Sequence, residues 1–256
     1  MNKPSYQAKP FSSLLWVVLG WLGLVLLAYS PLLFHPELHT ACPENDTWNL
    51  PVRWSVLSAL RAGQIPLWNP LSAFGIPWLA TWQTESFYPG TLLFVWKGLA
   101  AWNFSGILHL LILSAGVYAF LRASQVSTFW AFFSSSLALL NLCAFNHLGS
   151  NSSMDTMAWG PWMFLATREC LEGKPYGTLK GALFLALQVL AGYPQIIFYT
   201  LAGCLAYGIF HSGRDSILKL MKPLALGLLF SAAQWVPSVE YFFINSVRLP
   251  AVPEAG

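Results

Sequence analysis

The sequence predicts an all-α integral membrane protein with about seven transmembrane helices and one large loop on the outer face. Only 9% of the 256 residues are charged, against about 25% in ordinary soluble domains, and the mean hydropathy is +0.55. So few charged side chains cannot coat a water-soluble surface of this size. Long apolar runs leave little sequence for a second domain, so we expect residues 1–256 to form a single polytopic membrane domain.

The first apolar run, Leu14–Phe34, holds no charged residue over 21 positions. A helix of this length crosses about 30 Å of hydrocarbon. The run is longer than the ~7–15-residue core of a secretory signal, and no small-x-small cleavage site ends it. We therefore expect an uncleaved first helix.

Six further membrane segments are expected downstream, several of them short for a full span. Their approximate limits are Leu99–Leu121, Thr128–Phe145, Met157–Thr167, Leu179–Gly192, Gln195–Phe210 and Pro223–Val236. The fifth and sixth form one long apolar stretch that Gly192-Tyr193-Pro194 interrupts. Because proline lacks a backbone donor and clashes with the preceding turn, a break is predicted there.

The basic residues predict the orientation. With the N-terminus in the cytoplasm, every inner loop carries Lys or Arg, as the positive-inside rule requires. Nine of the 13 basic residues then lie inside: Lys3, Lys9, Arg122, Arg168, Lys174, Lys180, Arg214, Lys219 and Lys222. Most of the acids fall on the outer face, so carboxylate chemistry is expected there.

The largest stretch outside the membrane, residues 35–96, is rich in tryptophan and proline. Such composition indicates a folded loop at the membrane interface, where Trp prefers to lie. Residues 51–63 predict a short amphipathic helix, with proline at its start and glycine at its end. We expect Trp54, Leu57 and Leu60 along one stripe of this helix, with Arg53 and Arg61 elsewhere on it.

Glu44 and Asp46 are the first candidate catalytic residues, because they lie one residue apart about ten residues beyond the first helix. Two such carboxylates can share a divalent cation, or one can remove a proton from an acceptor hydroxyl. Two solvated acids in a polar turn is the alternative. No other metal ligands are indicated.

Other polar side chains recur among the aromatic residues of the loop and near the helix ends. They suit either a carbohydrate or phosphate surface or a rigid loop whose aromatics face lipid. Asp155, at an expected helix start, can also be a simple cap. The candidate substrate-binding residues are Arg53, Arg61, Trp68, Asn69, Gln83, Glu85, Asp155, Gln195, Glu240 and Arg248.

Several of these strings resemble one family. "RAGQIPLWNPLSAFGIP" and "FYPG" resemble the first outer loop of YfhO-type bacterial membrane proteins. "AWGPW", "LAGYPQIIFY" and "QWVPSVEYFFINSVR" match further parts of that family in the same order. The family is similar to multi-pass glycosyltransferases of the GT-C architecture, which take sugar from a polyprenyl-phosphate donor on the outer face.

The resemblance implies roles for particular residues. Asp46 matches the acidic position after the family's first helix, and Glu240, Ser246 and Arg248 match its later motif. Tyr193 stands where the family often has His, which argues against proton transfer there. The sequence ends at Gly256, much earlier than typical members, so we expect a truncated chain.

The function expected from the resemblance is sugar transfer, with Asp46, alone or together with Glu44, as base or metal ligand and with Arg53, Arg61 or Arg248 holding the lipid phosphate. The expected location is the bacterial inner membrane. The expected partners are the bilayer and a polyprenyl-phosphate-linked sugar, and not a nucleic acid. One alternative is a lipid-linked-sugar transporter, but the expected helices carry almost no polar residues. Another is a non-catalytic membrane module left by truncation.

Overall fold

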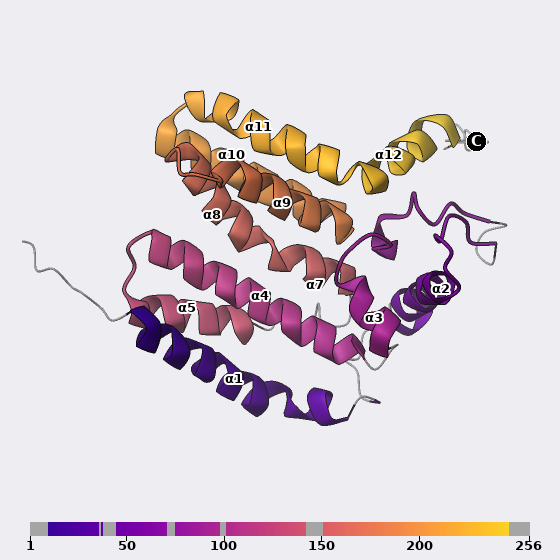
Figure 1. The fold of residues 1–256 in the computed structure, drawn as a ribbon, viewed down its shortest axis with the longest axis horizontal. Helices are drawn as coiled ribbons and strands as arrows, with labels where there is room; N and C mark the ends of the chain where they lie inside the picture. Colours follow the sequence, from indigo (N-terminus) through magenta and orange to yellow (C-terminus); the bar gives the residue numbers. More distant parts are fainter. Residues whose placement is uncertain are drawn as a thin grey trace, which may run out of the picture.

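The computed structural model of the protein describes residues 10–35, 37, 45–70, 75–97, 101–141 and 151–245. Within these ranges the chain is helical, and its β-type pairing is confined to the isolated bridge between Asn69 and Ile76. Long helices lie side by side, and short helices cover one end of them (Figure 1).

The long elements are packed around α4 (Trp102–Ala123), which contacts helices from both halves of the chain. On one side of α4 lie α1 (Pro10–Phe34) and α5 (Thr128–Leu139). On the other lie α7 (Asn151–Ala158) and α8 (Gly160–Leu171). Beyond them come α9 (Gly177–Leu190), α10 (Pro194–Ser212) and α11 (Asp215–Phe230).

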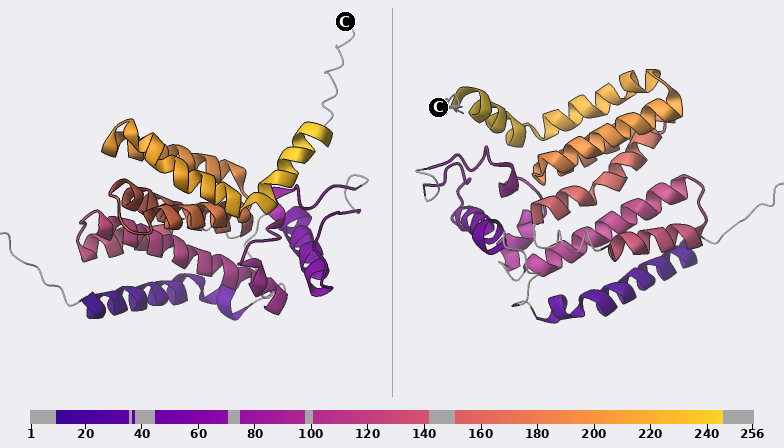
Figure 2. Two further views of the ribbon diagram at one scale, coloured as in Figure 1. Left: turned by 45° about the horizontal axis from the view of Figure 1, so that its top comes forward. Right: turned by 180° about the vertical axis from the view of Figure 1, so that it is seen from behind.

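The short elements are α2 (Leu50–Arg61), α3 (Thr91–Lys97) and α12 (Ala232–Glu240), with helical turns at Asn45–Asn49, Trp82–Thr84 and Tyr241–Asn245. Both views of Figure 2 place α2, α3 and α12 at the same end of the long helices. We call this end, covered by residues 45–70 and 75–97, the loop end.

Apolar side chains spaced about one turn apart build the core between the helices. Val17, Trp21, Val25 and Tyr29 form one buried face of α1 and pack against α4, α5 and α7. The Tyr29 hydroxyl donates to the Leu139 carbonyl at 2.7 Å. A second group of buried residues, Leu57, Phe94, Ala101 and Trp102, joins the loop to the start of α4.

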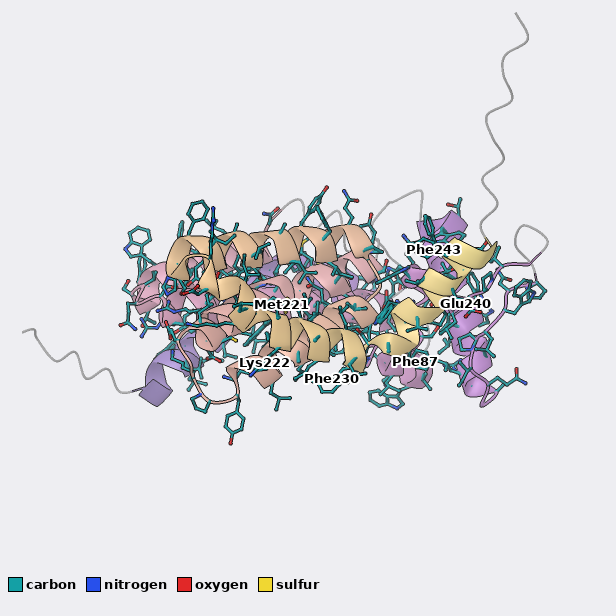
Figure 3. The ribbon with its side chains drawn as sticks, turned by 90° about the horizontal axis from the view of Figure 1, so that it is seen from above. Phe87, Met221, Lys222, Phe230, Glu240 and Phe243 are labelled. Carbon is teal, nitrogen blue, oxygen red and sulfur yellow. The ribbon has the colours of Figure 1, made fainter. Side chains whose placement is uncertain are left out.

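Basic residues gather at the opposite end, which we call the basic end. Arg168 at the end of α8 donates to the Ser124 hydroxyl beyond α4, at 2.8 Å. Lys180 at the start of α9 pairs with Glu169 at 2.6 Å. Figure 3 labels Lys222 on α11, well away from Phe87 of the loop and Glu240 of α12. The two ends of the bundle therefore differ in charge.

Two described helices are long and apolar enough to cross a membrane: Leu14–Phe34, with 21 residues, and Trp102–Ala123, with 22. A third span results if Asp215–Phe230 and Ala232–Phe243, bent by 79°, count as one. Thr128–Leu139 and Gly177–Leu190 are apolar but shorter. The all-helical prediction is confirmed over the described residues, whereas length and composition support two to three spans of the expected seven.

The predicted interruption between the fifth and sixth segments is confirmed. α9 ends at Leu190 and α10 begins at Pro194. Gly192 has a φ of +81°, a left-handed conformation that glycine adopts at no steric cost. The fourth segment is also broken, which we did not predict: α7 ends at Ala158 and α8 restarts at Gly160, because Pro161 cannot continue the hydrogen-bond ladder.

The seventh segment was wrongly placed. Its helix begins at Asp215, and Pro223 lies inside it. The expected continuous span to Val236 is bent by 79° at Ser231. The Ser231 hydroxyl donates to the Gly227 carbonyl at 2.8 Å, and such back-bonding favours a bend. α12 therefore turns over the loop instead of extending the span.

The stripe expected on α2 is not the face through which the helix packs. Arg53 is buried and Trp54 is 55% exposed, because α2 packs through Val52, Arg53, Val56 and Leu57. The periodicity correctly predicted a helix here, but it could not predict which residues the helix packs against.

We expect Gly192→Ala to destabilise the protein more than Gly173→Ala. Both glycines have positive φ, +81° and +67°, so an added methyl strains both. At Gly192 the new Cβ would also lie 2.0 Å from the Trp82 carbonyl oxygen, whereas nothing lies within 4 Å at Gly173. Strain alone should lower the apparent Tm in detergent by roughly 2–4 °C, and added overpacking by roughly 5–10 °C. Equal losses would contradict this packing of the loop against the α9–α10 turn.

Candidate functional site

Five ionisable side chains from four separate parts of the chain meet at the loop end. We call them the charged cluster. They are Arg53 of α2, Glu85 and Tyr88 of the segment between Thr84 and α3, His109 of α4 and Asp155 of α7. All five are buried, with exposed fractions of 3% or less. A buried group of charges costs free energy unless its members are paired, so their contacts decide what the cluster can do.

Arg53 and Glu85 form an ion pair of 2.7 Å that is closed to solvent. Arg53 also donates from Nη1 to the Thr91 hydroxyl at 3.1 Å, and its guanidinium lies 4.6 Å from the centre of the Phe94 ring. Thr91 in turn donates to the Glu85 carbonyl at 2.8 Å. These contacts fix the segment before α3 against α2.

Glu85 itself has a left-handed backbone, with a φ of 51°. This conformation is uncommon for residues other than glycine. It turns the chain at the end of the Trp82–Thr84 helical turn and directs the carboxyl group inward. Strained positions of this kind often occur at functional sites.

Tyr88, His109 and Asp155 form a continuous chain of hydrogen-bonding groups. His109 Nδ1 lies 2.8 Å from the Ser105 carbonyl and 3.0 Å from the Asp155 carboxylate. Both are acceptors, so we assign the hydrogen to Nδ1. Nε2 lies 2.6 Å from the Tyr88 hydroxyl, which also accepts from the Trp159 indole at 2.9 Å. The phenol can therefore donate to Nε2, and a proton can move along this chain.

Burial raises the pKa of Glu85 well above its usual value. Arg53 opposes this shift and the neighbouring Asp155 adds to it. Burial, and next the charge of Asp155, also raise the pKa of Tyr88. Both effects favour neutral side chains. Tyr88 thus remains a phenol that can donate a hydrogen bond.

A cavity of about 460 Å³ adjoins the cluster. Tyr88 belongs to both, Thr91 lines the cavity and accepts from Arg53 of the cluster, and Ser86 adds a hydroxyl group to the cavity wall. Apolar side chains form the rest of its lining: Leu60, Phe87, Pro89, Leu92 and Val95. Arg61, exposed on α2, donates from Nε and Nη2 to the carbonyl of Val95 at 3.4 and 3.3 Å. The cavity therefore combines an apolar lining with hydroxyl groups, and a guanidinium is bonded to the backbone of one lining residue.

The predicted catalytic pair is only partly described. Glu44 lies outside the described residues, and of Asp46 only the backbone, in the turn Asn45–Asn49, is described. Trp48, two residues later, donates to the Gln83 side chain at 2.5 Å. The backbone at Asp46 thus belongs to the same folded loop as Gln83 and Glu85.

The structure brings together three of the predicted binding residues, Arg53, Glu85 and Asp155. Two of their expected roles need correction. Arg53 is committed to Glu85 and cannot also grip a phosphate in this structure. Asp155 does not cap a helix, because it lies inside α7 and faces His109.

The remaining candidates lie elsewhere. Asn69 is buried and its backbone pairs with Ile76, whereas Trp68 is 57% exposed. Gln195 donates to the Tyr199 hydroxyl on an exposed face of α10. Glu240 is exposed at the end of α12. Arg248 lies outside the described residues.

Sequence reasoning missed His109, although a signal was present. It is an ionisable residue inside an otherwise apolar helix, which is a functional candidate by default. The expectation that the helices carry almost no polar residues was also wrong. Gln188 of α9 is buried and donates to the Thr200 hydroxyl at 2.8 Å and the Thr156 carbonyl at 3.2 Å.

In the part of the chain that the structure describes, no group of three or more His, Cys, Asp or Glu side chains is arranged to hold a metal ion. Comparison with family models, with curated proteins and with solved structures finds no match to this chain.

We expect Arg53→Met to destabilise the protein by about 3–5 kcal/mol, because it leaves two buried carboxyl groups without their cation. Arg61→Met is the matched control on the same helix: Arg61 is exposed, and its loss should cost within about 0.5 kcal/mol. Denaturant titration of the purified protein measures both. Similar losses for the two variants would show that the Arg53–Glu85 pair contributes nothing special.

Proposed function

We propose that this protein crosses the membrane about seven times and transfers a sugar from a polyprenyl-phosphate donor to an acceptor hydroxyl at the loop end. In this proposal residues 35–96 face outward, and the protein lies in a bacterial inner membrane. The resemblance of its loop and helix motifs to YfhO-type proteins, which are similar to GT-C glycosyltransferases, motivates the reaction class.

The exposed apolar surface supports the membrane part of the proposal. Large apolar side chains cover the outside of several helices, among them Leu27, which is 83% exposed, and Phe210, which is 91% exposed. Many large exposed apolar side chains on one helix indicate contact with lipid or another protein. α1 and α10 both carry such side chains along their lengths, as lipid contact requires.

Seven spans require short helices to be extended. α9, with 14 residues, is about 21 Å long at 1.5 Å per residue, less than the ~30 Å of hydrocarbon. The break of α7 from α8 and the bend of α11 into α12 lie within protein, where neighbouring side chains satisfy interrupted backbone. At the bend of α11 into α12, for example, the Ser231 hydroxyl and the Trp235 indole donate to the Gly227 and Leu228 carbonyls, each at 2.8 Å.

The cavity at the loop end is the observation that carries the transfer reaction. Its hydroxyl groups and aromatic rings suit a sugar, and its apolar lining suits the start of a lipid chain. Arg61, bonded to the carbonyl of the lining residue Val95, would hold the phosphate after releasing that carbonyl. The acceptor oxygen forms a bond to the anomeric carbon, while the bond from that carbon to the phosphate oxygen breaks. The proton of the acceptor passes to the Asp46 carboxylate, and the phosphate leaves with its negative charge against Arg61.

Topology provides the first test. Reporter fusions after Arg122, Lys174 and Lys219 should read cytoplasmic, because the basic end follows the positive-inside rule. Fusions near Asp46 and Asn151 should read external. A cytoplasmic signal at Asp46 would reverse the orientation and remove the outward-facing site with it.

Activity provides the second test. We expect Asp46→Asn to lower transfer from a radiolabelled polyprenyl-phosphate sugar by about 10²–10⁴-fold in proteoliposomes, since the loss of a general base has this effect. Glu172→Gln, at the basic end, is the control. It should leave the transfer rate unchanged.

Three other outcomes would contradict the assignment. If Asp46→Asn keeps full activity and Asp155→Asn is inactive, the assignment of Asp46 as the catalytic carboxylate is wrong. Activity of both would remove the catalytic role of these acids. Movement of the labelled donor across the bilayer without chemical change would favour a transporter, an alternative that the buried polar side chains of α4, α9 and α10 keep open.

A further inference from the structure

The charged cluster contains more negative than positive charge. Arg53 supplies one permanent cation, and Glu85 and Asp155 supply two carboxyl groups. His109 is neutral if Nε2 accepts from Tyr88, as the 2.6 Å contact allows. With both carboxyls ionised, the buried cluster would carry one uncompensated negative charge. Such a charge is costly, and uptake of one proton removes it.

Among the residues that the structure describes, no other ionisable group balances this charge. Around Glu85, Tyr88 and His109, the electrostatic influences come from the members of the cluster themselves: Arg53 from α2, Glu85 from the segment before α3, and Asp155 from α7. Trp159 contributes a neutral indole. The described residues contain no group of three or more His, Cys, Asp or Glu side chains arranged to hold a metal cation at this position.

The geometry places the extra proton between the two carboxyl groups. Glu85 and Asp155 lie within hydrogen-bonding reach of each other. Glu85 Oε1 and Asp155 Oδ2 are buried and receive no hydrogen bond from any described group. Two carboxylates cannot donate to each other, whereas a carboxylic acid donates to a carboxylate. One proton therefore supplies the donor that both oxygen atoms lack.

The alternative place for the proton, His109, is less favourable. An imidazolium would donate from Nε2 to the Tyr88 oxygen, which already accepts from Trp159. The phenol hydrogen would then lose its acceptor among the described groups. The two carboxyl oxygens would still lack a donor.

We propose that Glu85 and Asp155 form a buried proton-binding site, in which one shared proton fastens the loop to the helix bundle. Glu85 belongs to the loop and Asp155 to α7, so the shared proton joins the two directly beside the cavity. This site does not depend on the sugar-transfer proposal. It follows from charge and hydrogen bonding alone.

The proposal determines the sign of the pH dependence. The pKa of Glu85 is raised in the folded protein above its ordinary value of 4.5, chiefly by burial. The folded state therefore binds more protons than the unfolded state between the two pKa values, and stability falls as pH rises through that range. The contribution is fully present below pH 4.5 and is lost above the raised pKa.

The experiment compares the wild type with Glu85→Gln, Asp155→Asn and the double variant by apparent Tm from pH 4.5 upward. The wild type should lose roughly 3–5 °C per pH unit over part of this range. Each single amide removes one carboxyl group, so the remaining carboxylate balances Arg53 without an added proton. Each single variant should therefore stay within about 3 °C of the wild type at pH 5 and should lose the fall of Tm with pH. The double variant leaves Arg53 without a counterion and should melt roughly 6–12 °C lower.

The opposite pattern would overturn the proposal. If both carboxylates are ionised and His109 carries the proton, each single amide leaves a buried cation unpaired. Both single variants would then lose as much as the double variant is expected to lose. A wild-type Tm that rises with pH above 4.5, with the slope abolished in Glu85→Gln, would also refute a shared proton.

Infrared difference spectroscopy keeps the proposal testable if a variant folds poorly. The wild type at neutral pH should show the C=O band of a protonated carboxyl that both Glu85→Gln and Asp155→Asn remove. Glu172→Gln is the control: hydrogen bonds from Lys174 and Arg168 lower the pKa of Glu172 to about 2, so this acid is ionised. Absence of the band from the wild type, or its loss in the control alone, would overturn the proposal.

Discussion

The buried ion pair of Arg53 and Glu85 is the interaction on which the loop end depends. It joins two parts of the loop 32 residues apart in sequence, and its members reach α4 and α7 through Tyr88, His109 and Asp155. Because the cluster is buried, the loss of any one of these contacts costs free energy: a charge that loses its partner there has no water to replace it. Tyr88 and Thr91, two of the residues that line the cavity, are positioned by the same contacts.

Two further contacts hold the loop from other directions. α12 bends over it and donates to the carbonyls of Leu79 and Ala80. The α9–α10 turn approaches it so closely that Gly192 has no room for a side chain beside Trp82. The breaks at Gly192 and Ser231 thus have a common effect, since both place interrupted helix ends against the loop. The helix interruptions and the site belong to one arrangement.

Local sequence patterns predicted the helical class, the first helix and the break at Gly192-Tyr193-Pro194, because proline and glycine restrict backbone directly. They also picked out Glu85 and Asp155. They could not show that Arg53 would be buried, since the face of α2 is chosen by Phe94 and Glu85, more than 30 residues away. His109 was overlooked because α4 is apolar on average, and only packing reveals that its one imidazole meets a carboxylate.

Hydrogen–deuterium exchange of the wild type and Arg53→Met measures most directly whether the charged cluster holds the loop on the helices. Exchange reports local opening with free energies from zero to that of global unfolding. We expect faster exchange in Arg53→Met for the backbone amides of residues 82–91, with little change in α9. Unchanged exchange in residues 82–91, or an equal increase in α9, would contradict it.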